Sequence, residues 1–280
     1  MNLVGKMRNR ILLVFVALLA LLCYAESERV GQGIGGWVNR SPDSPEKAGG
    51  SEKMARLEFP VITDARSEYL LYKTGFVVNY NVDWRIPNWV AYELTDDETF
   101  GEVERAGHFK VDEDAPSPRV ETSAYSHSGY DRGHMIPAAD VKWSQQAMYD
   151  SFLMTNICPQ NPNLNRGDWN DLEELCRSWA KKWGRLYIAC GPVVTDNPQR
   201  IGDVGVVVPA AFFKVVLRMG EEVESIGFLF ANRAGSKPLQ TYAMSVDDLE
   251  TVCNMDFFSL LPDSLEECVE QELDVRVWNW

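Results

Sequence analysis

The chain has 280 residues, 45% of them apolar, with nine tryptophans and a formal net charge of −14 at neutral pH. This composition supplies a sizeable core for one large domain and excludes a disordered or low-complexity chain. The acidity also argues against general adhesion to polyanions, so a nucleic-acid-binding function would need Lys and Arg concentrated locally.

The first 25 residues are predicted to be a secretory signal peptide. Three basic residues precede a short apolar run over residues 11–22, and a polar stretch follows residue 25;. The run is short for a membrane span, so an uncleaved anchor is the second alternative, and lipid attachment at Cys23 is the third. Cleavage would lower the net charge from −14 to −17, because three cations and no carboxylates would be lost. We therefore expect export to the periplasm or the extracellular space, with no stable membrane span afterwards.

Residues 26–56 are predicted to be a flexible linker, because Gly, Ser, Pro and charged residues dominate them;. Gly31, Gly33 and Gly36 form a G-x-G-x-x-G pattern in this segment. No strand signal precedes the pattern and no helix signal follows it, so a dinucleotide site is not predicted. The remaining residues, 57–280, are predicted to form one domain.

The domain is predicted to be of the α+β class, with strands in the centre and helices outside. Runs of β-branched and aromatic residues between turn formers predict the strands, and apolar residues at helical spacing predict the helices. Between residues 96 and 128 lies a long loop, which is expected to be functional or disordered. Strands are expected at 69–80, 88–94, 152–158, 185–194, 204–219 and 224–231, and helices at 144–152, 168–183, 246–253 and 265–272.

Five cysteines follow the predicted signal peptide: Cys158, Cys176, Cys190, Cys253 and Cys268. In an exported protein some of them are expected to pair, although an odd number cannot all pair within one chain. Cys253 and Cys268 flank a short terminal segment and are a candidate pair. No C-x-x-C or His/Cys spacing accompanies the cysteines, so a metal cluster is not predicted.

Three motifs carry a family resemblance: Asp131-Arg132-Gly133-His134, then Asn156-x-x-Pro159-Gln160, then Leu164-Asn165-x-x-x-Trp169-x-x-Leu172-Glu173. Together they resemble the DNA/RNA non-specific endonucleases of the ββα-metal, or His-Me finger, class, which includes the endonuclease G-like enzymes. The resemblance runs from about residue 76 to residue 261. It implies an α+β domain with a mixed central β-sheet, flanking helices and a ββα-metal finger active site.

The chain contains three histidines, His108, His127 and His134. No motif adjoins His108 or His127, so both are predicted to be surface or structural residues. The resemblance implies that His134 is the general base that deprotonates the attacking water. Its unperturbed pKa near neutrality suits that task, and we expect activity to titrate there. Gly133 is expected to allow an unusual backbone conformation or a close approach.

Asn165 precedes the longest predicted helix, so its side chain could be a simple N-cap. The resemblance instead implies that Asn165 is the one direct protein ligand of Mg²⁺, with Mn²⁺ as a substitute. A hard cation that takes few protein oxygens and keeps its waters is typical of Mg²⁺. We therefore predict a metal site at Asn165.

Glu173 and Arg177 are four residues apart and share a helix face, as does Lys181;. One interpretation of Glu173 and Arg177 is a solvated ion pair of small energy. The resemblance implies instead that Glu173 orders water near the metal and that Arg177 holds phosphate, both being part of the catalytic set. Lys181 continues the row as a substrate-binding candidate.

Two further arginines are candidates. Arg105 lies in the pattern R-x-x-x-F-x-x-D, where the family has a phosphate-binding arginine, and is assigned to the catalytic set. Arg132, with Asp131, is expected to position the motif backbone, and Arg132 is also a substrate-binding candidate. Asn156 is predicted to be a local scaffold residue.

The resemblance predicts a secreted, Mg²⁺-dependent endonuclease that hydrolyses DNA, RNA or both with little sequence specificity. A site that contacts phosphate and metal rather than base edges accounts for the low specificity. The alternative is a catalytically inactive member of the same fold, acting as a nucleic-acid-binding protein or as an interaction module of the cell envelope.

Overall fold

The computed structural model describes residues 56–220, 222–235 and 237–280. The predicted signal peptide and all of the predicted linker except residue 56 lie outside these residues. Within the described part of the chain, every helix lacks either the length or the apolar character needed to cross a membrane.

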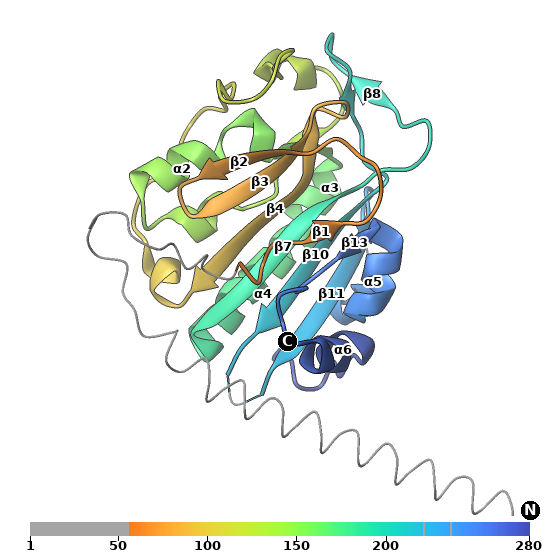
Figure 1. The fold of residues 1–280 in the computed structure, drawn as a ribbon. Coiled ribbons are helices and arrows are strands. Elements are labelled where there is room, and N and C mark those ends of the chain that lie inside the picture. The colour runs from red at the N-terminus through yellow and green to blue at the C-terminus, as the bar shows by residue number, and fades with distance from the viewer. Residues whose placement is uncertain (1–55, 221, 236) are drawn as a thin grey trace, which may run out of the picture.

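The centre of the fold is a seven-stranded sheet in the order β12-β11-β10-β7-β4-β3-β2 (Figure 1). Each pairing in this sheet is antiparallel. The predicted α+β class is therefore confirmed, with a central sheet that is antiparallel rather than mixed. The strands are β2 (Tyr69–Lys73), β3 (Phe76–Asn81), β4 (Ile86–Thr95), β7 (Arg185–Val193), β10 (Ala211–Arg218), β11 (Glu224–Ala231) and β12 (Ala243–Met244).

Both faces of the sheet are covered, because side chains alternate between the faces along each strand. On one face Phe212 and Val216 of β10 pack with the apolar side of α4 (Asp168–Trp183). On the other face Phe213 and Val215 pack with α5 (Val246–Cys253) and α6 (Asp263–Gln271). Figure 1 shows α5 and α6 beside β11, with α4 behind the sheet.

A small β-hairpin and two helices form a compact unit on the α4 face. Strand β5 (Asp131–His134) pairs with β6 (Ile157–Gln160), α3 (Pro162–Arg166) follows, and α4 begins two residues later. The remaining elements are short: β1 (Val61–Ile62), β8 (Arg200–Ile201), β9 (Val206–Val207), β13 (Met255–Asp256), α2 (Gln145–Ser151), and the 3₁₀ turns at Asp97–Phe100, Thr122–Tyr125, Ala138–Val141, Met154–Asn156 and Leu239–Tyr242.

The helix predictions are confirmed to within two residues at each end, and the bounds of β11, α4 and α5 match fully. Residues 69–80 divide into β2 and β3 at a turn where Gly75 has φ +82°, and residues 204–219 divide into β9 and β10. The strand predicted at 152–158 is wrong, because residues 154–156 form a 3₁₀ turn and β6 begins at Ile157.

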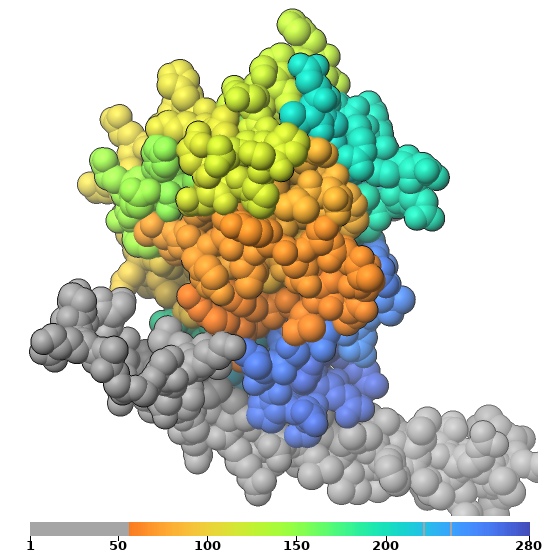
Figure 2. All heavy atoms as spheres, turned by 45° about the horizontal axis from the view of Figure 1, so that its top comes forward, coloured from red at the N-terminus to blue at the C-terminus, as the bar shows by residue number. Residues whose placement is uncertain are grey.

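The segment from residue 96 to residue 128 is irregular, as predicted, but it is held against the domain. Lys110 exchanges two backbone hydrogen bonds with residues 152 and 154. The buried carboxylate of Asp112 accepts from Lys73 Nζ and Thr155 Oγ1 over 3.0 and 2.6 Å. Figure 2 shows the later part of this segment, in yellow-green, beside the teal residues around β8.

Cys253 is a buried free thiol, so the candidate pairing of Cys253 with Cys268 is wrong. Cys158, Cys176 and Cys190 are also free and fully buried. These four cysteines act as small apolar core residues.

Candidate active site

The hairpin β5–β6 aligns two of the sequence motifs. Gly133 lies opposite Cys158, and a Cβ atom at residue 133 would come within 2.2 Å of Gln160 Oε1. The predicted close approach at Gly133 is therefore confirmed. The side chain of Asn156 accepts from the backbone N–H of residue 136 and donates to the carbonyls of residues 136 and 151, which confirms its scaffold role.

His134 ends β5 inside an aromatic enclosure. Its ring lies 4.8 Å from that of Phe152, edge to face, and 5.2 Å from that of Phe109. Trp169 of α4 donates its indole N–H to the backbone carbonyl of His134 over 3.3 Å, which fixes the strand against the helix. The Nε2 atom of His134 is buried and has no hydrogen-bond partner among the described residues.

This enclosure determines the ionisation of His134. Burial, and then the positive charge of Arg105, lower the pKa of His134 to about 3;. The imidazole is therefore neutral at pH 7, as a proton acceptor must be. The structure therefore predicts no titration of His134 near neutrality in the free site, in contrast to the expectation from an unperturbed imidazole. An anionic phosphate beside Arg105 would offset that positive charge and make the imidazole more basic.

Asn165 is not the N-cap of α4, because it lies inside α3 and Gly167 occupies the cap position. Its Nδ2 atom donates to Asp131 Oδ2 over 3.0 Å, and Arg166 binds the same carboxylate over 2.7 and 2.8 Å. Because the amide nitrogen faces Asp131, Oδ1 is directed away from that carboxylate. A half-buried amide oxygen held in this way suits a hard cation such as Mg²⁺;.

Glu173 and Arg177 do not form the solvated pair considered above. Arg177 Nη1 donates to Asp140 Oδ1 over 2.8 Å, and the hydroxyl of Tyr92 donates to Asp140 Oδ2 over 3.1 Å. Asp140 is 2% exposed, so Arg177 is fixed by a buried carboxylate rather than by Glu173. Glu173 is itself buried, and this burial raises its pKa to about 8.

Lys214 supplies a buried positive charge beneath these groups. It lies in the middle of β10 with its side chain fully buried, and its ammonium lies 4.8 Å from the centre of the Trp169 ring. Its charge lowers the pKa of Glu173 and thereby opposes the effect of burial. Trp169 thus links Lys214 to the backbone of His134.

The other predicted cations occupy three different positions. Arg105 is exposed over the ring of Phe152, and its charge acts on both His134 and Glu173. Arg132 donates to the carbonyl of residue 122 over 2.8 Å, with its guanidinium over Phe109. Lys181 is exposed and lies over Phe100, one helical turn beyond Arg177. The structure therefore places Arg105 where its charge acts on both His134 and Glu173, places Arg177 near Glu173, and ties Arg132 to the preceding loop.

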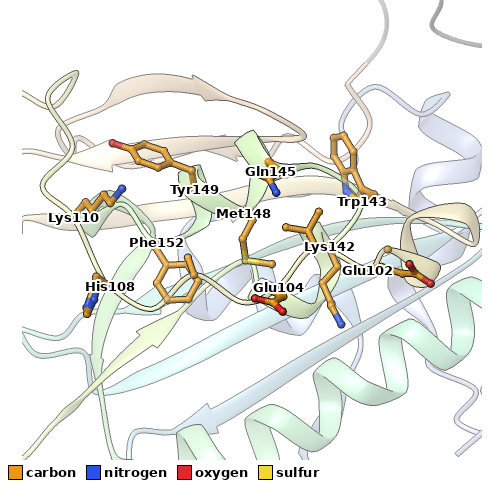
Figure 3. A pocket seen from close by; sticks show the side chains of 13 residues that line it. Glu102, Glu104, His108, Lys110, Lys142, Trp143, Gln145, Met148, Tyr149 and Phe152 are labelled. Atoms are coloured by element: carbon orange, nitrogen blue, oxygen red, sulfur yellow. The ribbon is translucent and has the colours of Figure 1, made fainter.

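Beside Phe152 lies a surface groove of about 670 Å³ (Figure 3). Phe152 lines the groove and also contacts the ring of His134, so it separates the two. Lys110 and Lys142 contribute positive charge to the groove, and Glu102 and Glu104 contribute negative charge. Trp143 and Tyr149 contribute partly exposed rings. His108 is exposed at its edge, as predicted for a surface residue, and His127 is exposed elsewhere.

Sequence reasoning missed Asp140, Lys214 and Phe152. Asp140 and Phe152 lie in short segments without a recognisable motif, and only the fold brings them to the site. Lys214 did carry a signal, because it interrupts the apolar run from Phe212 to Leu217 that was predicted to be a strand. A lysine within such a run indicates a buried charge with a specific role.

The raised pKa of Glu173 predicts a pH-dependent stability. Between the unfolded value near 4.5 and the folded value near 8, the folded chain keeps a proton that the unfolded chain loses;. The contribution of Glu173 to the free energy of unfolding is therefore fully present below pH 4.5 and is lost as the pH rises towards 8. Glu173→Gln should remove this part of the decline, on the order of a few kcal/mol. Urea unfolding in the presence of a chelator, at several pH values, would measure the free energy of unfolding of both proteins. If this free energy falls equally with pH in the wild type and in Glu173→Gln, the prediction is contradicted.

A β-hairpin followed by a helix, with a histidine on the first strand and an asparagine just before the long helix, defines a ββα-metal nuclease. The crystal structure of EndoG in its complex with EndoGI matches this fold with a TM-score of 0.66 and 26% identity, covering 70% of this chain and 88% of that one. Residues 55–264 match the DNA/RNA non-specific endonuclease family. The chain belongs to that family.

Two relatives show the extent of the similarity. A nuclease of Nostoc sp. (strain PCC 7120) is 32% identical over 219 residues, which cover 74% of this chain and 79% of the relative. The mitochondrial nuclease EXOG of Mus musculus is 30% identical over 239 residues, which cover 79% of this chain and 64% of the relative. The described domain thus corresponds to most of the Nostoc protein and to just under two thirds of the mouse protein.

Proposed function

We propose that this protein is an exported, metal-dependent endonuclease that hydrolyses phosphodiester bonds of DNA, RNA or both with little sequence preference. The observation that supports the proposal most directly is the orphaned Nε2 atom of a neutral His134, on the same ββα unit as Asn165 and beside Arg105. Export rests on the sequence of residues 1–25.

His134 would accept a proton from water at Nε2 as the water oxygen forms its bond to phosphorus and the bond to the leaving oxygen breaks. Asn165 would hold the metal through Oδ1, with Asp131 fixing the amide. When bound, Mg²⁺ or Mn²⁺ supplies Lewis-acid stabilisation of the charge that develops on phosphate and leaving group. Arg105 and Arg177 would add fixed positive charge at the same place.

Glu173 would orient water next to Asn165. Burial raises the pKa of Glu173 to about 8, and the charges of Lys214 and Arg177 oppose that rise. Arg132 and Lys181 are proposed as outer contacts to the nucleic-acid backbone. Because these groups contact phosphate rather than base edges, little sequence preference follows.

Cleavage of supercoiled plasmid and of single-stranded RNA by the purified protein tests the proposal. We expect nicking with Mg²⁺ and none with a chelator. If the chelator leaves cleavage unchanged, the metal mechanism is wrong. If nucleic acid is bound but not cut under either condition, the protein is an inactive nucleic-acid-binding protein. If nucleic acid is neither bound nor cut, the alternative of an envelope interaction module replaces the proposal.

A further inference from the structure

Helices α5 and α6, on the opposite face of the sheet from His134, bring three carboxylates together. Asp247 and Glu250 lie one turn apart near the start of α5, and Glu270 lies in the last turn of α6. One oxygen from each of the three lies within 4.8 Å of the other two. Figure 1 shows the two helices in blue, next to each other beside β11.

Glu270 distinguishes this cluster from an ordinary acidic surface. Its side chain is 4% exposed, and Oε1 is buried without a hydrogen-bond partner among the described residues. Two other buried carboxylates of the domain have a cationic partner: Asp112 binds Lys73, and Asp140 binds Arg177. A buried carboxylate oxygen without a donor costs free energy, so a cation bound at Glu270 would stabilise the fold.

The charges around Glu270 increase the free-energy cost of leaving its carboxylate without a positive partner. The four largest charge effects on its carboxyl all come from other carboxylates, those of Glu250, Glu266, Asp247 and Asp256. No basic side chain is among these neighbours, so a bound cation would supply a positive charge that the cluster itself lacks.

Glu250 is already fixed in position for a ligand. One of its oxygens, Oε1, accepts the backbone N–H of Phe257 over 2.6 Å, just after β13. Asp247 is exposed, Glu250 is half-buried and Glu270 is buried, so the cluster opens to solvent at one end. An ion could enter from the side of Asp247 and keep water on that side.

We propose that Asp247, Glu250 and Glu270 bind a divalent cation of the size of Ca²⁺, which fastens α5 to α6. Oxygen ligands lie about 2.3–2.6 Å from Ca²⁺, so two ligand oxygens on one ion can be about 5 Å apart, and three oxygens within 4.8 Å of one another are close to the spacing that a shared ion requires;. Ca²⁺ also accepts irregular carboxylate sets, whereas Mg²⁺ needs near-octahedral geometry at about 2.0–2.1 Å. This site is separate from the nuclease site and does not depend on the proposed function.

Thermal unfolding and calorimetric titration of the chelator-treated protein with CaCl₂ alone test the site. Binding to the folded state raises Tm with cation concentration, on the order of 5–10 °C at a hundredfold excess over Kd. Glu270→Gln should abolish this rise. Glu267→Gln, an exposed glutamate on the same helix, is the matched control and should keep it. Millimolar MgCl₂ should give a smaller rise.

The two metal sites can be told apart with Asn165→Ala, which should keep the full Ca²⁺-dependent rise in Tm. Glu270→Gln should in turn keep Mg²⁺-dependent cleavage near the wild-type rate. No rise in the wild type at millimolar Ca²⁺ would overturn the proposal and leave a protonated Glu270 as the explanation. A rise that persists in Glu270→Gln, or that disappears in Asn165→Ala, would also overturn it.

Discussion

His134→Ala should lower kcat/KM for plasmid cleavage by about 10²–10⁴, because removal of a positioned general base typically has an effect of that size. The neutral imidazole, with its orphaned Nε2 atom and Arg105 beside it, can take a proton from water at pH 7. His108→Ala and His127→Ala should stay near the wild-type rate, since both side chains are exposed and lie in loops.

Loss of packing must be separated from loss of the base, because the ring of His134 is enclosed by Phe109 and Phe152. His134→Phe keeps an aromatic ring in the enclosure but cannot accept a proton. It should be as inactive as His134→Ala while keeping a Tm closer to that of the wild type. A wild-type rate for either variant would overturn the assignment of the base.

The pH profile provides a second test of His134. With a pKa near 3 in the free enzyme, His134 should produce no acid limb in kcat/KM near pH 6.5;. An inflection there that disappears in His134→Phe would show that the enclosure opens in solution. Measurement at saturating Mg²⁺ keeps metal binding from contributing to the profile.

The elements that the sequence predicts well are those whose bounds are set locally. Apolar residues repeat along α4 at helical spacing, and Gly184, with φ +84°, ends the helix. At the start of α5 the side chain of Ser245 caps the backbone N–H of residue 248. Such signals lie within a few residues of the element that they define, so they can be found without the fold.

The elements that the sequence predicts poorly depend on distant partners. Residues 152–158 have the composition of a strand. However, the side chain of Asn156 binds backbone groups of residues 136 and 151, and a 3₁₀ turn forms there instead. The short helix α3 around Asn165 was also missed, because five residues give no measurable periodicity;.

The active-site residues also fall into two groups, those that can be found from the sequence and those that only the fold reveals. His134, Asn165 and Glu173 stand in motifs and can be named from the sequence through the resemblance. The groups that set their electrostatics cannot, because Asp140 comes from a 3₁₀ turn and Lys214 from a strand that is distant in sequence. Burial decides the low pKa of His134 and the high pKa of Glu173, and burial is a property of the folded chain.

Asn165→Ala should lower kcat/KM at low millimolar Mg²⁺ by at least about 10²-fold, because Lewis-acid stabilisation is worth several kcal/mol and each 1.4 kcal/mol is a factor of ten. The change removes the amide oxygen that we assign to the metal and leaves Asp131 bound to Arg166. The fold should persist, since Asn165 is half-buried and makes one side-chain hydrogen bond among the described residues.

The dependence of the rate on Mg²⁺ concentration distinguishes a metal ligand from a positioning residue. For Asn165→Ala the concentration that gives half-maximal rate should rise, and excess Mg²⁺ should restore part of the activity. Asn163→Ala, on the same short helix with an exposed side chain, should leave both quantities unchanged.

Asn165→Asp keeps an oxygen ligand but places a second carboxylate 3.0 Å from Asp131, so it should bind Mg²⁺ and lose stability when the metal is removed;. An unchanged Mg²⁺ requirement in Asn165→Ala, with only the maximal rate lowered, would assign Asn165 to positioning and the metal to other ligands.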